Sequence, residues 1–521
     1  MPDSPTSEPE STFVCDCDDW VRSACAGEPF YRELEDKRYC VLHFPSKEKS
    51  ADFQQALQRK LANEDFDFRG VWFPDKIGFN IFFFKAEARF NYAVFNDKAY
   101  FRSVHFSSDI FLAWADFSHA TFRAEADFSH ADFRVFTDFS HADFRKHTDF
   151  SHATFSRKAH FSDTVFRAEA VFQSATFVAE VDFCSTTFNE NANFTYSKFG
   201  GTTEFRRSTF DKRADFDSAN FSQDVNFTDV TFGAEANFYS TTFDANADFY
   251  SATLSGDVNF INAAFSKKAG FSRATFRAYV KFAASKIRPV FGDQASLDFQ
   301  FARIEELDRI SFHTLILLPH WFVNADARKF SFTNVEWNYD LNRDIEDLAA
   351  RRVGPSHRLL AVAYRQLALN AEENHRYEEA SKFRYMAMET RRLESWRGFA
   401  PWRLSWWYWL ASGYGERVWQ AFFVLLGILL LSALLYNQVG FARWEPKVAS
   451  ESDLVAAKRD EVGTPMKFSR ALMYSLAVMT LQKPEPRPAT TAAQTVVILE
   501  TILGPVQAAL LALAIRRKFM R

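Results

Sequence analysis

The chain has 521 residues, a formal net charge of −4 and a hydrophobic content of 47%. Its length permits several domains, and its nearly neutral charge gives no electrostatic reason to expect nucleic-acid binding. Five cysteines in so long a chain exclude the disulfide framework of a small secreted protein. The first ten residues are acidic and rich in Pro and Ser, so we expect no signal peptide there.

The N-terminal segment, residues 1–69, concentrates Cys and His. Cys40 and His43 are spaced as two ligands on one turn, and thiolate and imidazole are ligands that Zn²⁺ selects. The segment predicts a zinc site built from four of five residues, and buried free thiols in a small core are the alternative. The five residues are Cys15, Cys17, Cys25, Cys40 and His43. We expect this segment, with a helix from Asp52 to Asn63, to cap the repeat region that follows.

Phenylalanine recurs from Phe73 to Phe282 at intervals that alternate between five and six residues. The residue two positions before each Phe is small, and the residue between them is usually Asp, Asn or Thr. Units this short cannot fold alone, so they must stack into a solenoid. Eleven residues are too few for a closed coil around a Phe core, whereas about 22 residues give four faces. The pattern predicts a four-sided β-helix in which a local bulge absorbs the extra residue of alternate faces.

The repeated units Ala-Asp-Phe-Ser-His and Ala-Thr-Phe-Arg-Ala resemble those of the pentapeptide-repeat proteins. The resemblance implies a right-handed quadrilateral β-helix over residues 70–338, of which the part from about Arg288 to Trp337 forms a terminating cap. At about 22 residues per coil, the ladder gives roughly nine to ten coils and a rod of roughly 45 Å. The spacing slips between Phe106 and Phe117, where we expect a kink.

Four Ser-His pairs follow successive Phe residues of the ladder. At about 22 residues per coil, His119 is expected over His141, and His130 over His152. Such columns suit either a metal or pH-sensing site or a surface ladder of a duplicated unit. We favour the surface ladder, because no carboxylate converges on the pattern.

Some pentapeptide-repeat proteins mimic DNA and bind topoisomerases, a role that requires a dominant acidic face. Between Phe73 and Phe282 the 26 acidic residues are nearly balanced by 22 basic residues. This balance disfavours a DNA-mimic topoisomerase inhibitor, so we expect no nucleic-acid partner. It leaves a protein partner on the β-helix open.

Residues 339–397 change to a helical period. Two amphipathic stripes, separated by residues 374–377, predict a helical hairpin. The pair resembles a single tetratricopeptide unit, and one unit is too small to form a peptide-binding groove. We therefore expect a spacer or an oligomerisation hairpin between the β-helix and the membrane.

The last segment, residues 398–521, contains two stretches long and apolar enough to span a bilayer, 418–438 and 492–515. A Trp-rich and Tyr-rich stretch before the first span predicts an interfacial helix. Basic residues before the first span and after the second predict that both termini are cytoplasmic. We expect a multi-pass protein of a bacterial-type inner membrane, with the β-helix in the cytoplasm, where thiols stay reduced.

Between the spans lies a shorter apolar segment, residues 467–481, followed by an irregular stretch rich in proline. This order resembles the two-span pore unit of potassium channels. The resemblance implies a re-entrant pore helix, a homo-oligomer with a tetramer favoured, and pore or filter residues at Thr480, Leu481 and Gln482. Potassium channels follow this helix with a glycine-rich filter, whereas Thr480-Leu481-Gln482-Lys483-Pro484 has no glycine. A pore here is therefore not potassium-selective by sequence.

Glu500 is the one charged residue inside the second span. A carboxylate at that depth costs about 2.5–3.5 kcal/mol on insertion scales, so it must face protein or water. One interpretation makes Glu500 a pore or filter residue. The other places it behind the re-entrant helix, hydrogen-bonded to Tyr474 or Ser475. Gly504 and Pro505 predict a kink and a hinge in the same span.

The sequence contains no Ser-His-Asp set, phosphate-binding glycine loop or carboxylate pair at a useful spacing, so we expect no enzymatic activity. The leading hypothesis is a channel-like oligomeric pore in membrane lipid, coupled through the helical hairpin to a cytoplasmic β-helix that acts as sensor or scaffold. The alternative is a non-conducting, membrane-tethered interaction scaffold.

Overall fold

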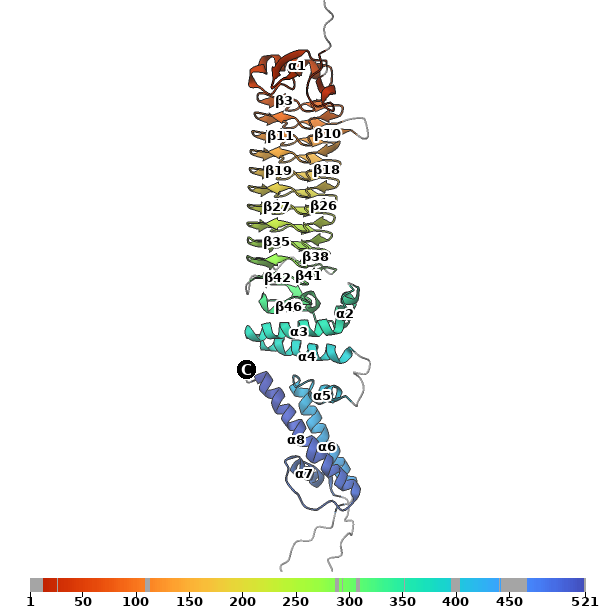
Figure 1. Ribbon diagram of the computed structural model, residues 1–521. Coiled ribbons are helices and arrows are strands. Elements are labelled where there is room, and N and C mark those ends of the chain that lie inside the picture. The colour runs from red at the N-terminus through yellow and green to blue at the C-terminus, as the bar shows by residue number, and fades with distance from the viewer. Residues whose placement is uncertain are drawn as a thin grey trace, which may run out of the picture. The chain divides into compact units, whose positions relative to one another are not determined.

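The structure is a computed structural model that describes residues 13–25, 27–107, 113–285, 290–292, 294–305, 310–350, 352–394, 403–439, 441 and 466–519. The chain forms two compact units, Met1–Tyr339 and Asp340–Arg521. The first unit holds a β-solenoid and the second is helical (Figure 1). The boundary between them falls where the Phe ladder has ended and the helical period begins.

The N-terminal segment folds as a small cap on the first coils of the solenoid. It contains η1 (Arg22–Cys25), the antiparallel strands β1 (Phe30–Leu34) and β2 (Lys37–Cys40), η2 (Lys47–Lys49) and α1 (Ser50–Ala62). Phe53 of α1 packs edge-on against Phe73 of the first coil, with 5.5 Å between ring centroids. The backbone N–H of Trp72 donates a hydrogen bond to the Leu42 carbonyl. These contacts cover strand edges that would otherwise lie unpaired at the end of the stack.

The solenoid is built from stacked coils (Figure 1) of short parallel strands, most of them two residues long. These strands form one sheet along each of four sides. Partners lie 22 residues apart, as when Thr121 pairs with Asp143 and Asp143 with Val165. Within the described residues the four sheets contain 9, 10, 11 and 12 strands. In that order, the first two run from β5 (Phe83–Phe84) to β37 (Ala264–Phe265) and from β6 (Ala88–Arg89) to β41 (Ser296–Asp298). The other two run from β3 (Trp72–Phe73) to β42 (Arg303–Ile304) and from β4 (Ile77–Gly78) to β45 (Phe330–Thr333). The predicted four-sided coil of about 22 residues is confirmed.

The solenoid continues beyond the end of the regular Phe ladder. Residues expected to form a separate cap extend three of the sheets, through strands that include β43 (Ile310–His313), and β44 (Ile316–Leu317) pairs with β46 (Glu336–Trp337) in parallel. Phe282 stacks on Phe312, and Phe312 on Phe332. The solenoid therefore has about 11 turns, which is more than the ladder alone indicated.

Stacked Phe rings fill the interior. Phe117 lies 4.8 Å from Phe139 of the next coil with the rings nearly parallel, and it meets Phe128 of its own coil edge-on at 5.5 Å. Offset stacking and edge-to-face contact are the favoured arrangements of aromatic pairs. All three rings are fully buried, and each contributes about 1.5–3 kcal/mol. The five cysteines remain free thiols, so it is this core that holds the solenoid together.

Alternate corners of the coil contain a residue in the left-handed region, with φ between 53° and 61°. In the regular part of the ladder these residues recur every eleven positions. The carboxylate of Asp116 accepts a hydrogen bond from the backbone N–H of Ser118 and closes one such turn. The strands on either side pair without a shift in register, so the extra residue of the six-residue units lies in the other corners. The predicted bulge is wrong in this respect.

The Ser-His pairs occupy the left-handed corners. His119 stacks on His141 at 4.6 Å, and His130 stacks on His152 at 4.8 Å, which confirms the expected columns. Histidine tolerates the left-handed region better than most side chains. Most later coils place Ser, Asp or Asn at the same corner, and Tyr196, Arg207 and Arg273 are the exceptions. The histidines therefore have a local backbone reason for their position, as expected of a surface ladder.

The slip in spacing after Phe106 is an insertion of five residues. Ala115 pairs with Ala88, 27 positions earlier, and Phe117 stacks on Phe90 at 4.7 Å with an angle of 4° between the rings. The ladder therefore closes over the insertion with its register intact, in place of the expected kink. Residues 108–112 themselves lie outside the described residues.

The second unit is a set of helices. They are α2 (Leu341–Ala350), α3 (Ser356–Glu373), α4 (Tyr377–Leu393), α5 (Leu404–Ser412), α6 (Val418–Gln438), α7 (Phe468–Met479) and α8 (Thr491–Phe519). The helices α3 and α4 form the expected hairpin, in which Tyr364 packs against Phe383. The buried Tyr364 hydroxyl donates a hydrogen bond to Asp344 of α2. The helices α6, α7 and α8 pack against one another.

Candidate metal centre and candidate membrane spans

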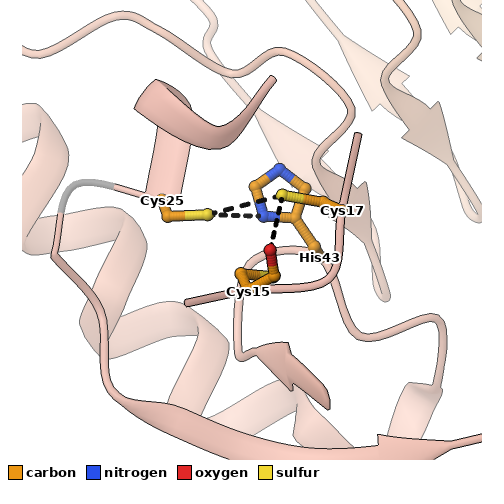
Figure 2. Close-up of side chains that lie close together, drawn as sticks. All are labelled: Cys15, Cys17, Cys25 and His43. Atoms are coloured by element: carbon orange, nitrogen blue, oxygen red, sulfur yellow. Dashed lines mark hydrogen bonds between the residues drawn. The ribbon is translucent and has the colours of Figure 1, made fainter. Parts of the chain in front are cut away.

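Three thiols and an imidazole converge inside the N-terminal cap. The ligand atoms of Cys15, Cys17, Cys25 and His43 all lie within 4.8 Å of one another, and Figure 2 shows the four side chains gathered around one point. Cys25 ends η1, and His43 follows β2, so separate short elements hold the set together. Cys15, Cys25 and His43 are buried, and Cys17 is partly exposed. This Cys₃His cluster can hold a metal ion.

The imidazole of His43 is oriented for coordination. Its Nε2 lies 3.0 Å from the Arg69 carbonyl oxygen, which can only accept, so Nε2 carries the proton. In the neutral imidazole the lone pair is then on Nδ1, which lies 3.5 Å from the Cys25 sulfur. Ligating histidines are held in the same way, with the second ring nitrogen donating to a carbonyl or carboxylate.

Cys40, the fifth predicted ligand, lies beside the same histidine. Its sulfur is 3.2 Å from Nδ1 of His43, and its backbone N–H donates to the Cys15 sulfur at 3.3 Å. The structure therefore brings all five predicted residues together.

The pKa values of the neighbouring thiols are shifted in opposite directions, and a bound cation would relieve this difference. Hydrogen bonds from Cys17 and Cys25 lower the pKa of Cys15, whereas the hydrogen bond to Cys15 raises the pKa of Cys17 to about 12. The thiolate is therefore favoured at Cys15 and disfavoured at Cys17, so negative charges on neighbouring sulfurs conflict. A divalent cation removes this conflict, because it stabilises several thiolates at once.

Two helices of the second unit are long and apolar enough to cross a membrane. They are Val418–Gln438 and Thr491–Lys518, with mean hydropathies of 2.4 and 2.0 over their most apolar windows. Within each window 17% is buried inside the structure, so most of these side chains lie on the outside of the unit. The two predicted spans coincide with these helices to within three residues at each end.

Glu500 joins three helices. Its buried carboxylate accepts hydrogen bonds from the Ser475 hydroxyl of α7 and, at 2.5 Å, from the Tyr436 hydroxyl of α6. This geometry matches the interpretation that Glu500 lies behind the shorter helix. Ser475 was an expected partner, whereas Tyr436 was not. The other expected partner, Tyr474, packs edge-on against Tyr436 at 5.1 Å.

Gly504 is the point where the end of α7 meets α8. A Cβ placed on Gly504 would lie 3.0–3.3 Å from three Met479 atoms, one of them in the backbone. Gly504 therefore permits close approach of the two helices, a role that its sequence position did not reveal. The helix α8 continues through Pro505, so the expected hinge stays a prediction.

The predicted pore residues follow directly after α7. Leu481 is left-handed, with φ 61°. The N–H groups of Leu481 and Gln482 donate to the carbonyls of Val478 and Ala477, and these two bonds define a Schellman cap. The Thr480 hydroxyl donates to the Leu476 and Ala477 carbonyls. The side chains of Thr480, Leu481 and Gln482 are all exposed.

The family model described as Pentapeptide repeats (9 copies) matches residues 150–198 and 194–242. Both ranges lie in the most regular coils, so the solenoid is built from pentapeptide repeats. Comparison with curated proteins and with solved structures gave no match.

Proposed function

We propose that the second unit inserts in a membrane and assembles with other copies into a pore, with α7 as a re-entrant helix. The observation that carries this proposal is the depth reached by α7. Its residue Ala471 belongs to the same apolar cluster as Ala493 near the start of α8, whereas Met479 packs on Gly504. Gly504 lies 13 residues beyond Thr491, about 20 Å along the helix.

A helix that ends inside the membrane needs other protein or water around the backbone that follows it. At 12 residues, α7 is about 18 Å long, too short to cross a hydrocarbon core of about 30 Å. The chain returns to α8 through residues 480–490, which are not helical. Irregular backbone persists at membrane depth only where protein or water covers it. Since Thr480, Leu481 and Gln482 are exposed in one copy, we infer that other copies and a water-filled space cover them.

The ion selectivity and the orientation of the pore are inferred from the sequence. The filter stretch has no glycine, so potassium selectivity is not included. We propose a tetramer in a bacterial-type inner membrane, with both termini cytoplasmic. The solenoid would then act as a non-enzymatic cytoplasmic arm that senses or binds a protein partner and biases the pore.

The test is the mass and conductance of the full-length protein. We expect a tetramer in lipid nanodiscs and discrete conductance in planar bilayers. Replacing the exposed Gln482 by Glu should raise the cation-to-anion permeability ratio several-fold, because it adds a ring of negative charge. Gln494→Glu, the same substitution at an exposed position in the first turn of α8, should leave the ratio unchanged. A monomer without conductance would favour the non-conducting scaffold.

We also propose that the Cys₃His cluster binds one Zn²⁺ and that this ion is structural. Four buried or half-buried N and S ligands suit tetrahedral zinc without an open position for catalysis. Metal analysis of the purified full-length protein should give about one zinc per chain. Cys25→Ser should abolish it, and Cys184→Ser, at a free cysteine of the solenoid, should not. Zinc-free wild-type protein with the cap folded would refute this assignment.

A further inference from the structure

A pocket of about 310 Å³ opens within the helical unit, where the α3–α4 hairpin meets the α5–α6 connection and the last turn of α8. Its wall includes three arginines from three different helices, together with one carboxylate, two tyrosines and an apolar floor. The arginines are Arg365 of α3, Arg384 of α4 and Arg517 of α8. Neither the pore nor the metal cluster accounts for this pocket.

Glu416 fixes two of these arginines in place. Its carboxylate is 4% exposed and lies 2.9 Å from Nε of Arg384 and 3.2 Å from Nη1 of Arg517. Arg384 also contacts Glu372 through Nη1. Three guanidinium groups thus face two carboxylates, and the pocket keeps a positive charge.

The arginines retain donors for a ligand. A guanidinium has five N–H donors, and the ion pairs in the described part of the chain engage Nε and Nη1 of Arg384 and Nη1 of Arg517. The Nη2 groups of both remain, and so does the exposed guanidinium of Arg365. Planar donor pairs held side by side match the oxygens of a phosphate group.

The position of the pocket indicates which class of phosphate compound fits it. Arg517 lies in the last turn of the membrane-crossing candidate α8. Tyr408 belongs to α5, a helix with the sequence LSWWYWLAS, and aromatic residues of this density favour the level of the lipid headgroups. Basic pockets between helices at that level bind anionic headgroups. Ala387 and Met388 supply an apolar floor for the glycerol and the first acyl carbons.

We propose that this pocket binds the phosphate of an anionic phospholipid headgroup. The inference rests on the membrane insertion of the proposed function and not on the pore. Because α4 and α8 both contribute arginines, a bound lipid would tie the hairpin to the second span.

The test uses full-length protein, delipidated in neutral detergent and titrated with phosphatidylglycerol or phosphatidylcholine under native mass spectrometry. Wild type should prefer phosphatidylglycerol by about five-fold or more. Arg365→Gln, which removes an exposed charge, and Met388→Trp, which fills the pocket, should each lower that preference several-fold. Arg358→Gln makes the same charge change two turns earlier on α3, at an exposed residue outside the pocket, and should have no effect.

Three results would overturn the proposal. One is equal binding of the two lipids by wild type. Another is an equal loss in Arg358→Gln and Arg365→Gln, which would mean diffuse surface attraction. The third is displacement of phosphatidylglycerol by inorganic phosphate at millimolar concentration, which would make a soluble phosphate compound the ligand. A monomer without conductance that still shows the lipid preference would support this proposal while refuting the pore.

Discussion

The solenoid and the helical unit are stabilised in different ways. In the solenoid, Phe150 stacks on Phe128 on one side and on Phe172 on the other, and the same contact recurs along each column. In the helical unit, α7 is joined to α6 and α8 through the carboxylate of Glu500. A repeated contact spreads the effect of a defect over neighbouring coils, whereas a carboxylate shared by three helices concentrates it.

The left-handed residues show the same difference. Those of the solenoid are periodic and mostly short or polar, such as Ser218 and Asp229, and each sits in the same turn. Leu481 adopts a similar φ of 61° at the end of α7, at a cap position that glycine usually occupies. Most corners of the solenoid are thus occupied by residues suited to the left-handed region. The cap of α7 has an exposed apolar side chain there instead, at a local cost of about 1–2 kcal/mol.

The largest expected effect is that of removing the proposed zinc from the N-terminal cap. Structural zinc contributes roughly 10–16 kcal/mol of apparent binding free energy in small zinc domains. Chelation should therefore unfold residues 13–69 while the central coils persist. Hydrogen exchange measured by mass spectrometry on the full chain would show protection lost in the cap and kept around Phe150. Unchanged protection of the cap in metal-free protein would contradict the prediction.

The next effect tests whether the solenoid spreads a defect. Phe150→Ala should lower the free energy of unfolding by about 3–5 kcal/mol, since it opens a cavity in a fully packed column. Hydrogen exchange should accelerate in the adjoining coils, around Phe128 and Phe172, and fade beyond them. Tyr196→Ala, at a side chain that is 58% exposed, is the control and should change little. A loss of protection along the whole solenoid would argue against local coupling.

The sequence was sufficient for the solenoid because each ladder residue meets a copy of itself one coil away. Residues that are one period apart in the sequence therefore contact each other in the structure. The sequence predicts less well where the period fails. In the last coils Ile304 stands opposite Phe276 and Leu297 stands opposite the small residue Ala269, so the sequence of this part indicates a separate cap. The helical unit has no such rule. The bond between Tyr436 and Glu500 joins positions 64 residues apart, and no local pattern specifies that pairing.

The third prediction tests the dependence on a shared carboxylate. Glu500→Ala leaves the Tyr436 hydroxyl without its acceptor, at a cost of about 1–3 kcal/mol for a buried group, whereas the Ser475 hydroxyl keeps the Leu429 carbonyl at 3.2 Å. We expect α7 to detach, with faster hydrogen exchange over Phe468–Met479. Glu500→Gln keeps an acceptor oxygen and should retain most of the protection. Equal protection in Glu500→Ala and wild type would mean that apolar packing alone holds α7.

The smallest expected effect distinguishes the stability of one protomer from the contacts between copies. Leu481→Gly relieves a left-handed side chain but adds freedom to the unfolded chain, so the protomer should gain about 0.5–1 kcal/mol. Arg207→Gly, at a solenoid corner with φ 59°, should show a similar gain. If Leu481 also seals against other copies, Leu481→Gly should weaken the oligomer or raise its conductance, and Arg207→Gly should do neither. A variant at Leu481 that is more stable and unchanged in mass and conductance would remove this residue from the pore, because an apolar side chain kept at a left-handed position would then have no role in the assembly.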